Sequence, residues 1–116
     1  MNRVERFPDF VRALPELDLP FAGARGWLIQ GTVQQVVFIE FDQTIEAPEH
    51  THAEQWEFAI AGRVTLHRGG TSTEYHPGES FYVASGEPHA ATVYAGYKAV
   101  MIFNQPDRYR TLPSTS

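Results

Sequence analysis

A succession of short, strand-like segments separated by turn signals constrains the fold of this chain more than any other sequence feature. The segments are rich in β-branched and aromatic residues, and glycine turns such as Ala61-Gly62 and Pro77-Gly78 separate them. We expect strands at residues 35–41, 56–60, 64–67, 80–83, 91–94 and 99–103. Many short strands at close spacing are typical of an all-β sandwich or small barrel.

The N-terminal region allows only a brief helix. Residues 9–14 have helical character, but Pro8 and Pro15 confine it to a turn or two. The chain has no uninterrupted apolar stretch typical of a signal sequence or of a membrane span, and no change of composition indicates a second domain. We therefore expect one domain over residues 1–116, located in the cytoplasm, with a polar surface tail at residues 104–116.

Composition excludes some partners and some metal ligands. The formal net charge of −5 argues against a nucleic-acid partner, whose phosphates require a basic surface. The chain contains no cysteine, which excludes disulfides and thiolate ligands. Any bound metal must therefore be held by nitrogen and oxygen atoms.

The segment from His50 to Glu57 contains the strongest chemical signal. Two imidazoles separated by one residue project from the same face of an extended strand, as in His50-Thr51-His52. A further histidine, His89, follows a Gly-Glu-Pro turn much later in the chain. Three imidazoles brought together by the fold provide three nitrogen ligands for a divalent metal, to which Gln55, Glu57 or Glu54 would add an oxygen.

These residues resemble the two motifs of the cupin family. The first motif joins His-x-His to a Glu or Gln at a fixed distance before a Gly, and residues 49–62 fit it. The second leads from a Gly through a short strand to a His, and residues 78–93 fit it, although Ala84 replaces the usual Pro. The resemblance implies a double-stranded β-helix (a jelly-roll barrel), a homodimer, and one divalent transition metal (Fe, Mn, Ni, Cu or Zn). The metal ligands that it implies are His50, His52, Gln55 and His89.

Two ways of counting residues give different fourth ligands. Counting back from Gly62 selects Gln55, whereas counting forward from His52 under a longer spacing selects Glu57. We favour Gln55, because the turn at Gly62 fixes the strand register and a slip of one residue would point the side chain to the other face. Glu54 is expected on the surface. A neutral amide and three neutral imidazoles leave the full charge of the metal uncompensated, which favours anionic or enolisable substrates.

The direction of the Glu57 side chain distinguishes the two functions that we consider. If the strand continues regularly, Glu57 points into the same pocket as Gln55, where it is a candidate catalytic acid or base. The first function is a metal-dependent enzyme, of the dioxygenase, isomerase or lyase type, acting on a small polar or anionic metabolite. The alternative is a non-enzymatic module that binds a sugar or organic acid, with a structural metal or none. An inward Glu57 favours the enzyme, and an outward Glu57 favours the binding module.

The remaining residues of this strand alternate with the pocket-facing set. We expect Trp56, Phe58 and Ile60 to pack against a second sheet or against a dimer partner. Beyond that second subunit, the only partner we expect is a small-molecule ligand, and we expect neither nucleic acid nor membrane as a partner.

Overall fold

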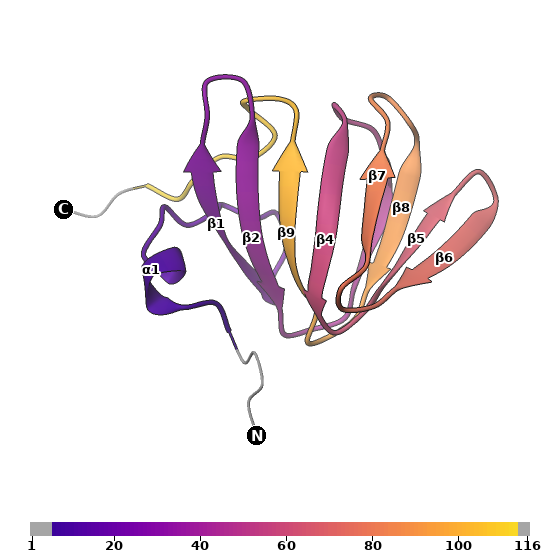
Figure 1. The fold of residues 1–116 in the computed structure, drawn as a ribbon, viewed down its shortest axis with the longest axis horizontal. Coiled ribbons are helices and arrows are strands. Elements are labelled where there is room, and N and C mark those ends of the chain that lie inside the picture. The colour runs from indigo at the N-terminus through magenta and orange to yellow at the C-terminus, as the bar shows by residue number, and fades with distance from the viewer. Residues whose placement is uncertain (1–5, 114–116) are drawn as a thin grey trace.

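The computed structural model describes residues 6–113, which form two antiparallel sheets and one short helix, as the all-β jelly-roll prediction requires. Strand β1 lies at one end of the molecule, near helix α1, and β6 lies at the other (Figure 1). In spatial order the five-stranded sheet contains β1 (Ala24–Gln30), β2 (Gln35–Phe41), β9 (Lys98–Phe103), β4 (Gln55–Ala61) and β7 (Ser80–Val83). The four-stranded sheet contains β3 (Ile45–His50), β8 (His89–Val93), β5 (Val64–Arg68) and β6 (Thr71–Tyr75).

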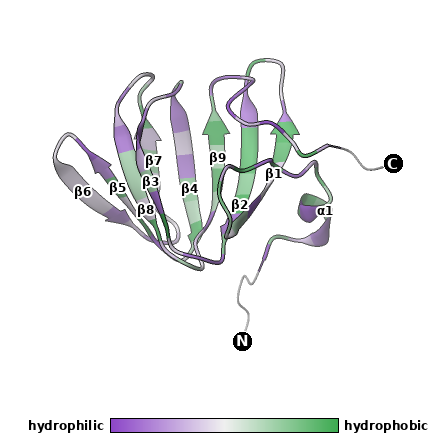
Figure 2. Ribbon diagram, turned by 180° about the vertical axis from the view of Figure 1, so that it is seen from behind, coloured by the Kyte–Doolittle hydropathy of each residue, from purple (hydrophilic) through white to green (hydrophobic). Residues whose placement is uncertain are grey.

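Strands β1 and β6 were not predicted from the sequence, and β3 was expected only around His50. Strand β6 is polar and largely exposed, so it has no alternation of buried apolar residues to reveal it. Figure 2 shows this difference, because β6 is pale to hydrophilic whereas β9 is hydrophobic over much of its length. Strand β3 contains Pro48, which lowers the strand signal. The helix, α1 (Asp9–Arg12), is shorter than the predicted residues 9–14 and ends in a cap at Ala13.

The core lies between the inner faces of the two sheets. Strand β2 alternates strictly, and its residues Val37, Ile39 and Phe41 are buried in this core. The same cluster includes Val64 of β5 and Val93 of β8, which lie on the facing sheet. Burial of these apolar side chains is the main stabilising contribution to a fold of this kind.

The outer face of the five-stranded sheet carries a second, smaller cluster. Trp27 of β1 is fully buried there with Phe7 and Val11, so α1 covers this part of the face. Ile60 packs against that cluster. Trp56 instead remains partly exposed and stacks on Phe58 with ring centroids 5.9 Å apart, so the pair does not face the second sheet of its own chain.

Of the six connections within residues 6–113 at which the chain crosses between the sheets, two join the strands that contain the sequence motifs. One runs from the end of β3 at His50 to the start of β4 at Gln55, and the other runs from the end of β7 to the start of β8 at His89. The backbone N–H of Gly86 donates to the carbonyl of His52 at 2.9 Å, so the two connections are hydrogen-bonded to each other. Gly86 has a φ of 75°, a left-handed conformation that glycine adopts without strain. The two sequence motifs therefore meet in space.

No helix within residues 6–113 has the length and hydrophobicity needed to cross a membrane.

Candidate metal centre

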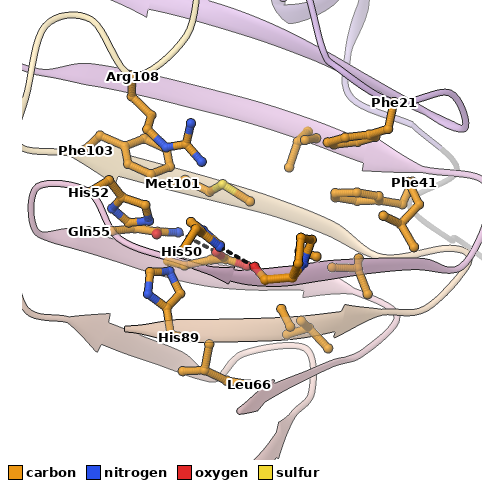
Figure 3. A pocket seen from close by; sticks show the side chains of 18 of the residues that line it. Phe21, Phe41, His50, His52, Gln55, Leu66, His89, Met101, Phe103 and Arg108 are labelled. Carbon is orange, nitrogen blue, oxygen red and sulfur yellow. Dashed lines mark hydrogen bonds between the residues drawn. The ribbon is translucent and has the colours of Figure 1, made fainter. Parts of the chain in front are cut away.

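Three histidines converge where the chain crosses between the sheets. His50 and His89 are direct partners in the β3–β8 pairing, and their ring centroids lie 4.3 Å apart. The ring of His52 lies 5.2 Å from that of His50 and 4.7 Å from that of His89. One nitrogen from each of the three rings lies within 4.8 Å of the other two (Figure 3). This spacing allows all three imidazoles to bind a single metal ion.

The position of His52 differs from the one expected from the sequence. We predicted that His50 and His52 share one face of a strand, but β3 ends at His50 and His52 lies in the connection to β4. The β3–β8 register shifts between Ala47 and His50, and the chain then leaves the sheet. The two imidazoles therefore converge because the connection turns across the gap between the sheets, and strand periodicity plays no part.

Each of the three imidazoles is oriented by a backbone carbonyl. The Nδ1 atoms of His50, His52 and His89 lie 2.8, 2.7 and 2.8 Å from the carbonyl oxygens of Pro48, Ala53 and Glu87. A carbonyl can only accept, so in each ring Nδ1 donates and carries the hydrogen. The neutral ring then presents the lone pair of Nε2, which is the arrangement found in metal-binding histidines.

Burial also keeps two of these rings neutral. Burial lowers the pKa of His52 to about 4, and the positive charge of Arg108 lowers it further, although the bond to Ala53 opposes this shift. Burial likewise lowers the pKa of His89. Neutral imidazoles bind a metal without first losing a proton, so these rings are ready to bind metal at neutral pH.

Gln55 and Glu57 both point into the cavity between the sheets. The Gln55 amide nitrogen donates to Glu57 Oε1 at 2.7 Å, which leaves the amide oxygen of Gln55 free. Figure 3 shows Gln55 beside His52. Among the described residues, no carboxylate belongs to the group of ligand atoms that lie within 4.8 Å of one another. Glu57 is therefore not part of the histidine group, and Gln55 as the fourth ligand stays a prediction until metal binding is measured.

Glu57 is a buried carboxyl group with two donors. Besides Gln55, the hydroxyl of Tyr97 donates to Glu57 Oε2 at 2.5 Å. Burial raises the pKa of Glu57 to about 7, although the hydrogen bonds from Tyr97 and Gln55 both oppose the rise. Burial, together with the charge of Glu57, raises the pKa of Tyr97. A carboxyl group with a pKa near neutral can both hold and release a proton, as a catalytic acid or base must.

Glu54, the remaining candidate oxygen ligand, lies away from the histidines. Its carboxylate accepts hydrogen bonds from the Tyr82 hydroxyl and from the Asn104 amide. The expected surface position of Glu54 agrees with these contacts.

The histidines lie at one end of a cavity of about 460 Å³. Phe21 and Phe41 lie at the opposite end (Figure 3). The walls of the cavity are largely apolar and come from both sheets, with Ile39, Met101, Phe103, Val64, Leu66, Phe81, Ala91 and Val93 among the lining residues. The cavity therefore has a polar end and an apolar end, which is the usual composition of a small-molecule site.

Three residues of this site were missed from the sequence. Tyr97 follows the turn at Gly96, and only its contact with Glu57 shows its importance. Arg108 and Tyr109 belong to the segment 104–116, which we expected as a surface tail, yet both line the cavity. Nothing in their local sequence indicates this, because the contact depends on the path of the chain after β9.

The donor atoms of this arrangement meet the requirements of a metal site. Three Nε2 atoms and one amide oxygen suit a divalent transition metal, and the backbone carbonyls supply the orienting hydrogen bonds. When bound, such a metal supplies Lewis acidity for a substrate oxygen or for water. The buried carboxyl of Glu57 is connected to this centre by the hydrogen bond that it accepts from the Gln55 amide.

A sequence model of the cupin domain matches residues 37–103, which include all of these histidines. A cupin from Shewanella frigidimarina, described as RmlC-like, has 21% identity and a TM-score of 0.71, and the match covers 92% of this chain and 94% of that chain. KdgF from Halomonas has 16% identity and a TM-score of 0.66, and the match covers 78% of this chain and 87% of that chain.

An oxalate decarboxylase variant from Bacillus subtilis has 15% identity and a TM-score of 0.67. That match covers 88% of this chain and 31% of the decarboxylase. At these identities the solved structures establish the shared fold alone. A search of curated proteins finds no match.

Proposed function

Because the chain belongs to the cupin family, we propose that it is a metal-dependent enzyme acting on a small polar or anionic metabolite. The reaction is of the dioxygenase, isomerase or lyase type. His50, His52, His89 and Gln55 hold one divalent transition metal, and Glu57 acts as the catalytic acid or base.

One observation carries the metal-binding part of this proposal. Three imidazoles from two distant motifs converge, and each has its Nδ1 bonded to a backbone carbonyl so that Nε2 is free. Solvated surface histidines have no reason to share both features. The arrangement therefore supports a built metal site at the polar end of the cavity.

The position of Glu57 favours an enzyme over a binding module. A carboxyl group in the protein interior, raised in pKa and bonded to Tyr97, is costly to bury and contributes nothing to apolar packing. A module that only binds a sugar or organic acid does not need such a group. The metal would polarise the substrate, and Glu57 would move a proton at its carboxylate oxygen.

Metal analysis of protein purified without an affinity tag tests the site. We expect a near-stoichiometric transition metal in the wild type and its loss in His50→Ala and in His89→Ala. His76→Ala is the matched control, because His76 is exposed and bonded to Glu74 outside the cavity. Equally little metal in the wild type and both site variants, even after reconstitution, would contradict the proposal.

A turnover assay then separates the enzyme from the binding module. With a panel of small organic acids and sugars, the metal-loaded wild type should convert at least one compound. Glu57→Gln should keep the metal and lose most of the turnover, by about 100-fold or more for the loss of a catalytic acid or base. A compound that binds tightly to the metal-loaded wild type but is never converted would favour the binding module.

The same proposal includes the location, the oligomeric state and the partners of the protein. We propose a cytoplasmic location and a homodimer, with a small molecule as the ligand and no nucleic-acid or membrane partner. The acidic net charge supports the absence of a nucleic-acid partner.

A further inference from the structure

We propose that the cavity binds a carboxylate with an apolar body and that Arg108 is the residue that recognises its carboxylate group. This inference deepens the proposed function, on which it rests, by naming the class of metabolite for the same cavity.

Arg108 approaches the polar end of the cavity from the segment that follows β9. Figure 3 shows its guanidinium on the same side of the cavity as His52, Met101 and Phe103. The guanidinium carbon lies 4.6 Å from the ring centroid of Tyr109 and 5.7 Å from that of Phe103. A cation–π contact uses the charge of the guanidinium and none of its N–H donors, so these donors stay available for a ligand.

The guanidinium has no protein partner within residues 6–113. Its Nε is buried and makes no hydrogen bond, and no carboxylate forms an ion pair with it. Arg12 offers a contrast, because its Nε is buried in the same way but its Nη2 pairs with Glu40. A partly buried cation without a partner is unfavourable, and an anion bound in the cavity would relieve that penalty.

The carboxylates that line the cavity are already bonded to other groups. Glu57 accepts from Gln55 and Tyr97, and Glu46 accepts from the Thr92 hydroxyl at 2.8 Å. Neither is an ion-pair partner of Arg108. The positive charge at this end of the cavity is therefore left for a ligand.

The apolar end of the cavity, opposite the histidines, determines the chemistry of the rest of the ligand. Phe21 and Phe41 are stacked there, with centroids 6.2 Å apart, and Ile39, Val64 and Leu66 continue the apolar walls. A ligand that spans the cavity must present a hydrocarbon body to these side chains. In the metal-free protein one guanidinium balances one negative charge, so a carboxylate fits better there than a doubly charged phosphate.

Calorimetric titration with a matched pair of probes tests this inference. The probes are 3-phenylpropionate and its neutral analogue 3-phenylpropan-1-ol, titrated into the full chain after EDTA treatment so that no metal contributes. Arg108→Gln removes the charge. Arg110→Gln is the matched control, because Arg110 is exposed, two residues away and absent from the lining of this cavity.

The wild type should bind the acid at least about tenfold more tightly than the alcohol, as a charge-assisted hydrogen bond predicts. Arg108→Gln should weaken acid binding by about ten- to a hundredfold and change alcohol binding by less than about twofold. Arg110→Gln should change neither.

Equal affinity of the wild type for acid and alcohol would overturn the inference, and that comparison needs no variant to fold. Tighter binding of phenyl phosphate than of the acid, or an equal loss of acid affinity in both variants, would also overturn it. The two proposals fail separately. A protein that holds no metal but discriminates through Arg108 refutes the enzyme proposal alone, and a metal-loaded protein without discrimination refutes the carboxylate site alone.

Discussion

Strands β2 and β4 flank the same central strand, β9, but they bury opposite kinds of residue. Strand β2 buries Val37, Ile39 and Phe41, as expected for a sheet with one face in the core. Strand β4 turns Gln55 and Glu57 inward, where they are 6% and 4% exposed, and leaves Trp56 41% exposed on its outer face. Packing explains these three residues of β2, and Gln35 at the start of the strand is buried with hydrogen bonds to Gln30 and to the backbone of Tyr109. Packing does not explain the inward Gln55 and Glu57 of β4, which line the cavity of the candidate site, and we propose that a dimer contact accounts for the exposed Trp56.

The largest loss of stability should come from β2, whose inward apolar residues pack in the core. Ile39 is 1% exposed, and Ile39→Ala should lower the free energy of unfolding by about 2–3 kcal/mol. We expect the lower part of the usual range because Ile39 already borders the cavity, so fewer contacts are lost. Urea unfolding measures the change. Ile29→Ala, at an exposed position of β1, is the control and should cost under about 1 kcal/mol. Similar losses in both variants would contradict this view of β2.

A substitution of the inward Glu57 on β4 should instead raise the free energy of unfolding at high pH. In metal-free protein, burial raises the pKa of Glu57 from 4.5 to about 7, so the folded state holds its proton more tightly than the unfolded state. The stability from this group is full below pH 4.5 and is lost as the pH rises through about 7. Glu57→Gln removes the buried charge and should stabilise the metal-free protein at pH 8 by at most about 3 kcal/mol.

His52 titrates in the opposite sense and provides a check on this prediction. Its pKa falls from 6.5 to about 4, so its contribution is full above pH 6.5 and is lost as the pH falls through about 4. The two groups oppose each other in the wild type, whereas the stability of Glu57→Gln should rise clearly with pH between 4.5 and 6.5. Urea midpoints across this range measure both curves. Parallel curves for the two proteins would show that Glu57 is not buried as a titrating group.

Metal affinity separates the two inward residues of β4. Gln55→Ala should weaken binding of the metal by about 10- to 100-fold, because it removes an oxygen ligand. Glu57→Ala should weaken it less, because Glu57 touches the site only through the Gln55 amide. Competition with a chelator of known affinity measures both. The reverse order of the two variants would make Glu57 the ligand and would overturn the register count from Gly62.

The same contrast explains what could be predicted from the sequence. Residues 35–41 were predicted with the bounds of β2, because this segment is rich in β-branched and aromatic residues. The inward direction of Glu57 followed from its spacing to Gln55. The loop position of His52, and the approach of Tyr97 and Arg108, depend on where the chain runs after it leaves a strand. Local sequence carries no record of such long-range contacts, so the two ligand motifs were recognisable while the rest of the cavity was not.

The smallest effect on stability should come from the outer face of β4. Trp56 is partly exposed and stacks on Phe58, so Trp56→Ala should change the free energy of unfolding of the monomer by less than about 1 kcal/mol. If a second subunit covers this face, the same change should weaken dimerisation by more than about 2 kcal/mol, because a central tryptophan is a typical anchor of an interface. Sedimentation equilibrium over a concentration series measures the association. Phe10→Ala is the matched control, since Phe10 is more exposed and lies on α1 rather than on β4. An unchanged dimer in Trp56→Ala would remove the contact as the reason for the exposed tryptophan, and the reversed pattern of β4 would then be explained by its inner face alone.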